Sequence, residues 1–294
     1  MNLGNKIKQL REENNMTQKE VARILEVEPG TISKYESNLI EPNIKSLKLL
    51  SDTFRITIDE LIREEDDDEE YEFDISEIDI LATIKEQQEM KLEGNLYHNT
   101  QIMFAYNSCH IEGNKISEVQ TRNIYNTQSI SFDGTSLLNV NDIVIMNNHF
   151  KLYDYMLDNI NKKISGAMIE SFYNILEEGT INNNNENKEI KDLEKIVTWY
   201  NSLNKISFEK IIELYVRIEK SKVFPSDNGI VGRMIMYREC LKNDIIPFII
   251  LDKDKLLFFR GLNEYQDKKE KDYLIEICLN AQDQYAKFIE KYLR

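Results

Sequence analysis

Residues 17–36 read Thr17-Gln-Lys-Glu-Val-Ala-Arg-Ile-Leu-Glu-Val-Glu-Pro-Gly-Thr-Ile-Ser-Lys-Tyr-Glu36. Thr17 is a good helix N-cap, and the apolar residues Val21, Ile24 and Leu25 follow it at helical spacing. A short turn that contains Pro29 then leads into a second apolar-periodic run. The stretch therefore predicts two short amphipathic helices joined by a tight connection.

The flanking sequence continues this pattern in both directions. Apolar residues recur at helical spacing before it, from Leu3 to Leu10, and after it in Ile44–Leu50 and Ile56–Ile62. The connections between these runs are only a few residues long. We therefore expect a compact five-helix unit at the N-terminus.

This unit resembles the phage-repressor-like (Xre, lambda-repressor-like) helix-turn-helix family over residues 3–62. The similarity rests on Met16–Ala22, Val27, Thr31–Glu36, Glu41-Pro42 and Ile58–Ile62. In that family the second helix contacts the DNA backbone and the third enters the major groove. The resemblance implies backbone contacts by Gln18 and Lys19, and a groove-facing set of Pro29, Gly30, Thr31, Ser33 and Lys34.

The chemistry of these residues agrees with those roles. Gln18 and Lys19 begin a helix, where free backbone N–H groups and the helix dipole favour phosphate. Thr31, Ser33 and Lys34 can donate hydrogen bonds to base edges, whereas neither proline nor glycine can read a base by its side chain. A helix-turn-helix retained only for protein contacts is the alternative interpretation.

The net charge of −15 is unusual for a DNA-binding protein until it is divided along the chain. Residues 1–63 hold ten basic and ten acidic residues, so the whole excess falls on residues 64–294. Contact with double-stranded DNA must therefore come from one face of the N-terminal unit, and it should be salt-sensitive.

Seven consecutive acidic residues, at positions 64–70, separate the two halves of the chain. Like charges at this density cannot share a packed surface, so we interpret residues 64–80 as a solvated acidic linker. The domains are then 1–63 and 81–294. A second interpretation is that the acidic residues mimic DNA and compete for the reading helix.

From about Ile75 onward the sequence predicts helix after helix. The clearest are Ile143–Leu157, Met168–Leu176, Ile190–Leu203, Phe208–Ile218, Val231–Leu241 and Tyr273–Leu293. Residues 129–138 and the asparagine-rich run 179–188 are predicted loops. The three cysteines and three histidines lack metal-ligand spacing, so we expect no metal through nitrogen or sulfur.

One loop and the helix after it suggest a specific site. Residues 222–233 read Lys222-Val-Phe-Pro-Ser-Asp-Asn-Gly-Ile-Val-Gly-Arg233, an anion-binding type of turn at a helix start. With Arg238-Glu-Cys-Leu241, Ile246-Pro-Phe-Ile-Ile250 and an upstream Asn107-Ser-Cys-His-Ile-Glu-Gly-Asn114, this stretch resembles the Fic family. Members of that family are helical enzymes that usually move AMP from ATP onto a protein hydroxyl. The resemblance implies a Fic-like helical domain here, with room for a small remnant β-hairpin.

The family motif is His-Pro-Phe-x-Asp/Glu-Gly-Asn-Gly-Arg-x-x-Arg. By this resemblance the pocket residues are Lys222, Phe224, Asp227, Asn228, Gly229, Gly232 and Arg233. Lys222, Ser226, Asp227 and Ile230 stand where the motif has His, the metal-binding acid, the first Gly and the first Arg. An ordinary lysine is protonated at neutral pH and cannot act as a general base. We therefore predict a pseudoenzyme with no catalytic residue.

The resemblance also assigns an inhibitory helix, marked by Ser108, Glu112 and Gly113. It would place Glu112 against Arg233, either as a buried structural pair or as a block on a surviving nucleotide pocket. We expect no cofactor and no metal. ATP with Mg²⁺ is the ligand that a surviving pocket would take.

Together these features predict an all-α, cytoplasmic transcriptional regulator that binds double-stranded DNA as a homodimer, because one short module buries too little surface for tight binding. Its Fic-like domain would dimerise, bind a protein partner or sense a nucleotide. No membrane segment is expected. Two alternatives remain open: a divergent protein nucleotidyltransferase that uses Asp227 for metal, and an antitoxin-like partner of an active Fic protein.

Overall fold

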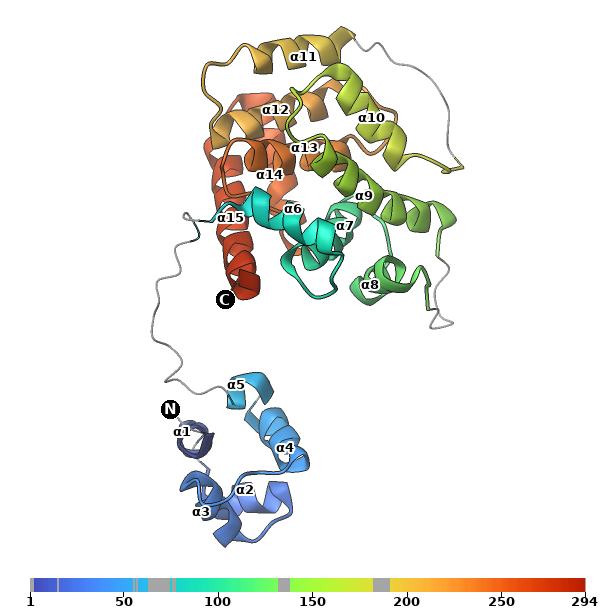
Figure 1. Cartoon of the computed structure of the whole chain (residues 1–294). Coiled ribbons are helices and arrows are strands. Elements are labelled where there is room, and N and C mark those ends of the chain that lie inside the picture. Colours follow the sequence, from blue (N-terminus) through green and yellow to red (C-terminus); the bar gives the residue numbers. More distant parts are fainter. Residues whose placement is uncertain are drawn as a thin grey trace. The chain divides into compact units, whose positions relative to one another are not determined.

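The computed structural model describes residues 3–14, 16–54, 56, 58–62, 75, 78–131, 138–181 and 191–293. The chain forms two compact units, residues 1–73 and 74–294 (Figure 1). The acidic linker predicted at 64–80 lies outside the described residues except for positions 75 and 78–80.

The N-terminal unit contains five helices among its described residues, as the sequence predicted. They are α1 (Leu3–Glu13), α2 (Gln18–Leu25), α3 (Pro29–Glu36), α4 (Ile44–Phe54) and α5 (Ile58–Ile62). One apolar side chain or more from each helix meets in a single core, which contains Ile7, Val21, Ala22, Leu25, Ile32, Tyr35, Leu50, Phe54 and Leu61. The helices are too short to be stable alone, so this core holds the unit together.

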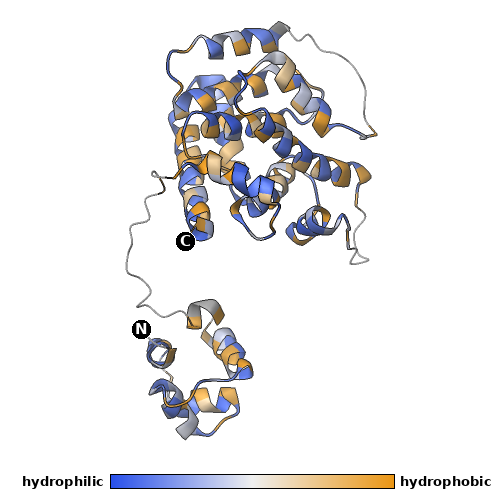
Figure 2. Cartoon of the chain, in the orientation of Figure 1, coloured by the Kyte–Doolittle hydropathy of each residue, from blue (hydrophilic) through white to orange (hydrophobic). Residues whose placement is uncertain are grey.

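The described part of the C-terminal unit is also helical. Its elements are α6 (Ile80–Met90), α7 (Leu96–Ile111), α8 (Glu118–Thr127), α9 (Val140–Asp158), α10 (Gly166–Leu176), α11 (Lys191–Asn201), α12 (Phe208–Ser221), α13 (Asn228–Lys242), a short 3-10 helix (Asp252–Asp254), α14 (Lys255–Lys268) and α15 (Asp272–Leu293). Hydrophilic and hydrophobic residues alternate along most of these helices (Figure 2). The all-α prediction is confirmed. No strand occurs in the described ranges, and residues 132–137 and 182–188 of the two predicted loops lie outside them.

Helix α13 is the centre of the C-terminal unit. It packs against α12, α10, α9, α7 and α6, and every residue from Gly229 to Leu241 is buried (Figure 1). A helix that is covered on all sides cannot leave its polar groups in water, so most of them need partners inside the protein. The tyrosine hydroxyl of Tyr237 does so by lying 3.2 Å from that of Tyr153 and 2.9 Å from that of Tyr285.

Arg238 on α13 closes the end of a neighbouring helix. Its guanidinium is fully buried, pairs with Glu239, and donates to the carbonyl oxygens of Ile160 at 3.0 Å and Lys162 at 2.5 Å. These carbonyls belong to the turn that follows α9. One side chain therefore ties this turn to α13.

None of the described helices combines the length and the apolar character that crossing a membrane would require.

Replacing Arg238 with methionine should destabilise the C-terminal unit by about 3–5 kcal/mol, because Glu239 would stay buried without its cation. Urea unfolding followed by the fluorescence of Trp199, the single tryptophan of the chain, measures this unit. Arg260→Met is the matched control, since Arg260 is exposed. An equal effect of both substitutions would contradict the assignment.

Candidate nucleic-acid interface and the site around Arg233

The start of α2 is fixed by a reciprocal cap. The Thr17 hydroxyl accepts from the backbone N–H of Glu20 at 3.3 Å, and the Glu20 carboxylate accepts from the backbone N–H of Thr17 at 2.6 Å. This capping box holds the first turn in place. Gln18 and Lys19, the predicted phosphate contacts, occupy that turn, and the Lys19 side chain is exposed.

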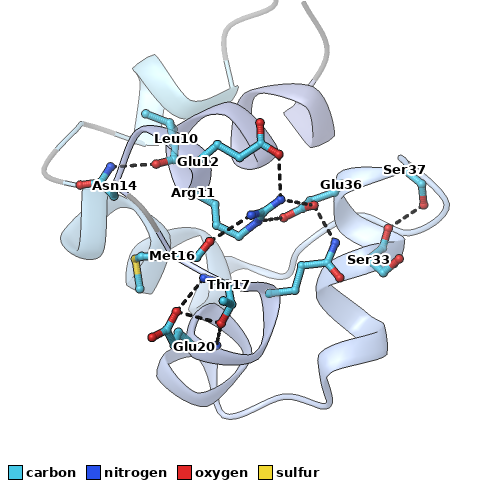
Figure 3. A network of polar contacts seen from close by, with 11 residues as sticks. Leu10, Arg11, Glu12, Asn14, Met16, Thr17, Glu20, Ser33, Glu36 and Ser37 are labelled. Carbon is cyan, nitrogen blue, oxygen red and sulfur yellow. Dashed lines mark hydrogen bonds and ion pairs between the residues drawn. The ribbon is translucent and has the colours of Figure 1, made fainter.

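A polar network ties this turn to α1 and α3 (Figure 3). Arg11 of α1 donates to the Glu36 carboxylate from Nε at 2.6 Å and from Nη2 at 3.1 Å, and its Nη1 donates to the Met16 carbonyl at 3.0 Å. Glu36 is buried at the end of α3 and also accepts from the Gln18 amide at 2.8 Å. One carboxylate thus fixes how α2 and α3 face each other.

Helix α3 divides into a buried face and an exposed one. Ile32 and Tyr35 point into the core. The predicted groove-facing set lies outward: Pro29, Gly30, Ser33 and Lys34 are exposed and Thr31 is partly buried. A methyl group added at Gly30 would meet nothing within 4 Å, so packing does not require glycine there. The exposed face is small and polar, which suits close approach to another molecule.

In the C-terminal unit the structure brings Ser108, Glu112 and Arg233 together. The buried Arg233 guanidinium donates to the Ser108 hydroxyl at 3.0 Å, to the Ser108 carbonyl at 2.9 Å, and to the Glu112 carboxylate at 2.8 Å. Glu112 caps the C-terminus of α7, and Gly113 follows it with φ of +97°. The arginine on α13 therefore holds the end of α7.

The Glu112 carboxylate also occupies the space above the start of α13. A Cβ atom at Gly229 would lie 2.1 Å from Glu112 Oε1, so a side chain here would force the Glu112 carboxylate to move. At Gly232 the constraint is different: a Cβ atom there would lie 2.7 Å from the ring of Tyr215 on α12. The two glycines thus serve the approach of a carboxylate and the close packing of two helices.

Asn228 braces the turn before α13. Its amide nitrogen donates to the Phe224 carbonyl at 2.7 Å, and its amide oxygen accepts from the Phe224 backbone N–H at 3.0 Å. The Phe224 ring stacks on Tyr173 with centroids 4.2 Å apart. Lys222, at the predicted general-base position, ends α12 with its side chain exposed. Asn228 is therefore already engaged within the protein.

Sequence reasoning missed one member of this site, Glu177 at the end of α10. Its carboxylate accepts from the Ser226 hydroxyl at 2.6 Å and from the Thr180 hydroxyl at 2.7 Å, and it shares a hydrogen bond with Asp227. Burial, followed by that hydrogen bond, raises the pKa of Asp227 to about 7. Burial opposes ionisation of Glu177 too, but hydrogen bonds from Asp227, Ser226 and Thr180 outweigh it and lower its pKa. No feature of the sequence marks Glu177 as a partner of Asp227.

The cysteines and the possible metal-binding side chains were also considered in the sequence. Cys109, Cys240 and Cys278 are buried free thiols. Among the described residues, no group of three or more histidine, cysteine, aspartate or glutamate side chains could hold a metal ion.

Known proteins resemble this chain in sequence at its N-terminal unit and in fold over most of its length. Residues 7–61 match the family model described as Helix-turn-helix. A 66-residue segment is 44% identical to the HTH-type transcriptional activator BcrR of Enterococcus faecalis; the match spans 22% of this chain and 32% of that protein, so the chain covers about a third of this relative. The N-terminal unit is a helix-turn-helix domain.

Solved structures that resemble the chain include Fic proteins. A Fic domain containing signaling protein from Bacteroides thetaiotaomicron superposes with a TM-score of 0.54 at 15% identity, over 72% of this chain and 95% of that one. Fic-1 from C. elegans superposes with a TM-score of 0.56 at 14% identity, over 97% of this chain and 84% of that one. At this identity the likeness establishes the fold, and the predicted Fic-like fold is confirmed.

The Asp227 carboxyl predicts a specific pH dependence. Its folded pKa lies above its unfolded value of about 3.9, so its contribution to stability is complete at low pH and is lost as the pH rises through about 7. Asn at this position keeps a donor for Glu177 and tolerates the positive φ of 55°. We expect Asp227→Asn to remove part of the fall in unfolding free energy between pH 5 and pH 8.

The measurement is urea unfolding at pH 5, 6, 7 and 8, followed by Trp199 fluorescence. Asp283→Asn, at an exposed position on α15, is the control and should keep the wild-type slope. An unchanged slope in Asp227→Asn would contradict the assignment of a titrating Asp227.

Proposed function

We propose that the chain is a sequence-specific, DNA-binding transcriptional regulator that acts as a homodimer. The observation that carries the proposal is the exposed polar face of α3, held against the start of α2 by the Arg11–Glu36–Gln18 network. This face belongs to a helix-turn-helix domain, and the matched relative is named as a transcriptional activator.

Each exposed group has a role in this proposal. Ser33 and Lys34 donate to base edges, and the open position at Gly30 lets the start of α3 approach the groove closely. Lys19 and the first backbone N–H groups of α2 bind phosphate. Because residues 1–63 carry no net charge, a single helix-turn-helix domain binds DNA weakly. Two such domains on paired half-sites supply the affinity.

We infer that the C-terminal unit is a pseudoenzyme that serves dimerisation or the sensing of a protein partner. Three observations at the replaced motif positions support this inference. The exposed Lys222 replaces the general base, the Ser226 hydroxyl in place of the metal-binding acid is bound to Glu177, and the apolar Ile230 in place of the first arginine is buried. Loss of these groups removes the base and the charge stabilisation that nucleotidyl transfer needs.

The Glu112 carboxylate adds a second obstacle to nucleotide binding. It is paired with Arg233 and fills the space over Gly229, where an incoming phosphate would need the same donors. An ATP molecule would have to displace this ion pair and meet the nearby carboxyl groups of Asp227 and Glu177. In this proposal the C-terminal unit functions while Glu112 blocks the nucleotide pocket.

Lys34→Ala should weaken binding to a DNA site that the full chain enriches from a random pool. We expect a loss of about 1–3 kcal/mol and relaxed preference at one base pair, because a base contact is removed. Gel-shift titration at fixed salt measures both. Lys253→Ala, an exposed lysine of the C-terminal unit, should bind like wild type. Equal losses in the two variants would point to general charge and against base reading by Lys34.

Incubation with labelled ATP and Mg²⁺ tests the pseudoenzyme inference. Wild type, Glu112→Gly and Asn228→Ala should all leave protein substrates and themselves unlabelled, since the base and the metal-binding acid are missing. Label on wild type or Glu112→Gly that disappears in Asn228→Ala would instead support the nucleotidyltransferase alternative.

A further inference from the structure

A cavity of about 450 Å³ lies in the C-terminal unit between the start of α6 and the segment that follows α13. Sites for small molecules typically have volumes of about 300 to 1,000 Å³, so this cavity is large enough for one. Helices α6 and α13 are in contact with each other. The walls of the cavity are apolar and come from both sides: Ile78, Ile80, Leu81, Leu241, Ile245 and Ile246.

The cavity is separate from the site around Arg233. Both involve α13, but Asn228 begins this helix and Leu241 lies in its last turn. At a rise of about 1.5 Å per residue, these two residues are about 20 Å apart along the helix. A ligand in the cavity would therefore leave the ion pair between Glu112 and Arg233 in place.

Two acidic residues, Asp79 and Asp244, complete the lining, and none of the described residues that line the cavity is basic. Asp244 is exposed, and its side chain forms no hydrogen bond or ion pair with any described residue. Asp79 caps α6 through Oδ1, which accepts from the Ala82 N–H at 2.8 Å. Lys242, the lysine nearest to Asp244 in sequence, donates to the Lys162 carbonyl. The apolar cavity therefore adjoins two carboxylates that lack a cation.

The end of α13 adds to this negative potential. The helix ends at Lys242, and its last carbonyl groups carry the partial negative charge of the helix dipole. The turn that follows is held by the Ile245 N–H, which donates to the Cys240 carbonyl at 3.0 Å. The N-terminus of α6 has the opposite polarity, but Asp79 already caps it. A positively charged group is therefore favoured at this cavity, and an anion is disfavoured.

We propose that the cavity binds a lipophilic organic cation, which is a small molecule with an apolar body and a positively charged nitrogen. The apolar body packs against the isoleucine and leucine side chains, and the nitrogen pairs with the carboxylates of Asp79 and Asp244. Burial of the apolar body supplies most of the affinity. The two carboxylates supply the selectivity for a cation.

The position of the cavity gives such a ligand a regulatory role. Asp79 and Ile80 are the residues at which the chain enters α6 from the predicted linker. A ligand bound to Asp79 therefore acts where the C-terminal unit is joined to the helix-turn-helix domain. The ligand is then an effector that changes how two helix-turn-helix domains reach paired half-sites. This role rests on the proposed DNA-binding function, whereas the cation site does not.

Calorimetric titration of the full chain at pH 7 tests the site with octylamine, octan-1-ol and octanoate. These probes share the length of their alkyl chain, and the amine is protonated at this pH. A partly exposed ion pair contributes up to about 5-fold in affinity, so octylamine should bind about 5- to 25-fold more tightly than octan-1-ol. Octanoate should bind most weakly. Octylamine that binds no more tightly than octan-1-ol, or not at all, would overturn the cation site.

Variants locate the binding. Asp244→Asn should weaken octylamine about 5-fold and leave octan-1-ol unchanged, and asparagine tolerates the positive φ of 53° at this position. Glu89→Gln is the matched control, because it removes an exposed carboxylate near the other end of α6 and should bind both probes like wild type. Leu81→Phe adds bulk inside the cavity and should weaken both probes. Circular dichroism melting checks that the variants fold, and wild-type octylamine affinity in Asp244→Asn would contradict the assignment.

A separate measurement tests the regulatory role. Saturating octylamine should change the affinity of wild type for DNA enriched from a random pool by about 5-fold or more, and that of Leu81→Phe by less than about 2-fold. Octylamine that binds without changing DNA affinity would overturn the effector role and leave the cation site standing. Enrichment of no DNA sequence would overturn the proposed function, and the calorimetric result on the cation site would stand by itself.

Discussion

The C-terminal unit is organised around the burial of one guanidinium, that of Arg233. A buried charge is costly unless it is paired and its donors are satisfied. The hydroxyl and carbonyl of Ser108 and the carboxylate of Glu112 supply partners for Nε and Nη2, and all of them lie in the last turn of α7 or just beyond it. The end of α7 must therefore lie against the first turns of α13, and the absence of a side chain at Gly229 leaves room for the Glu112 carboxylate in its present position.

In the helix-turn-helix domain, too, an arginine paired with a carboxylate holds helices together. Arg11 from α1 meets Glu36 at the end of α3, and Gln18 at the start of α2 joins them. A carboxylate at a helix end thus connects three helices in a domain whose core is small. This network engages the amide of Gln18, one of the two predicted phosphate contacts, but it leaves Lys19 and the exposed side chains of α3 free, so it can hold the reading surface rigid. Rigidity of this kind limits the conformational entropy lost on binding.

Sequence pattern and resemblance predicted much of this protein, and the failures have a common cause. Apolar periodicity predicted the five helices of the N-terminal unit. The motif resemblance predicted that Glu112 lies against Arg233, although more than a hundred residues separate them in sequence. Neither source could find Glu177, because its role depends on two helices meeting in space. Neither marked Leu39 and Ile44 as exposed, since an apolar residue beside a helix is ordinarily expected in the core.

The division between retained and replaced motif positions follows structure and not chemistry. The residues that match the Fic motif each have a contact that the fold needs: Arg233 binds the end of α7, Asn228 closes the turn before α13, and Gly229 admits a carboxylate. Among the replaced positions, Ile230 adds an apolar side chain to the core and Lys222 reaches solvent. A working transferase would have to keep its base and its phosphate-binding arginine whatever their packing. The scaffold that we propose needs only the residues that hold helices together, and Arg233 and Asn228 are residues of that kind.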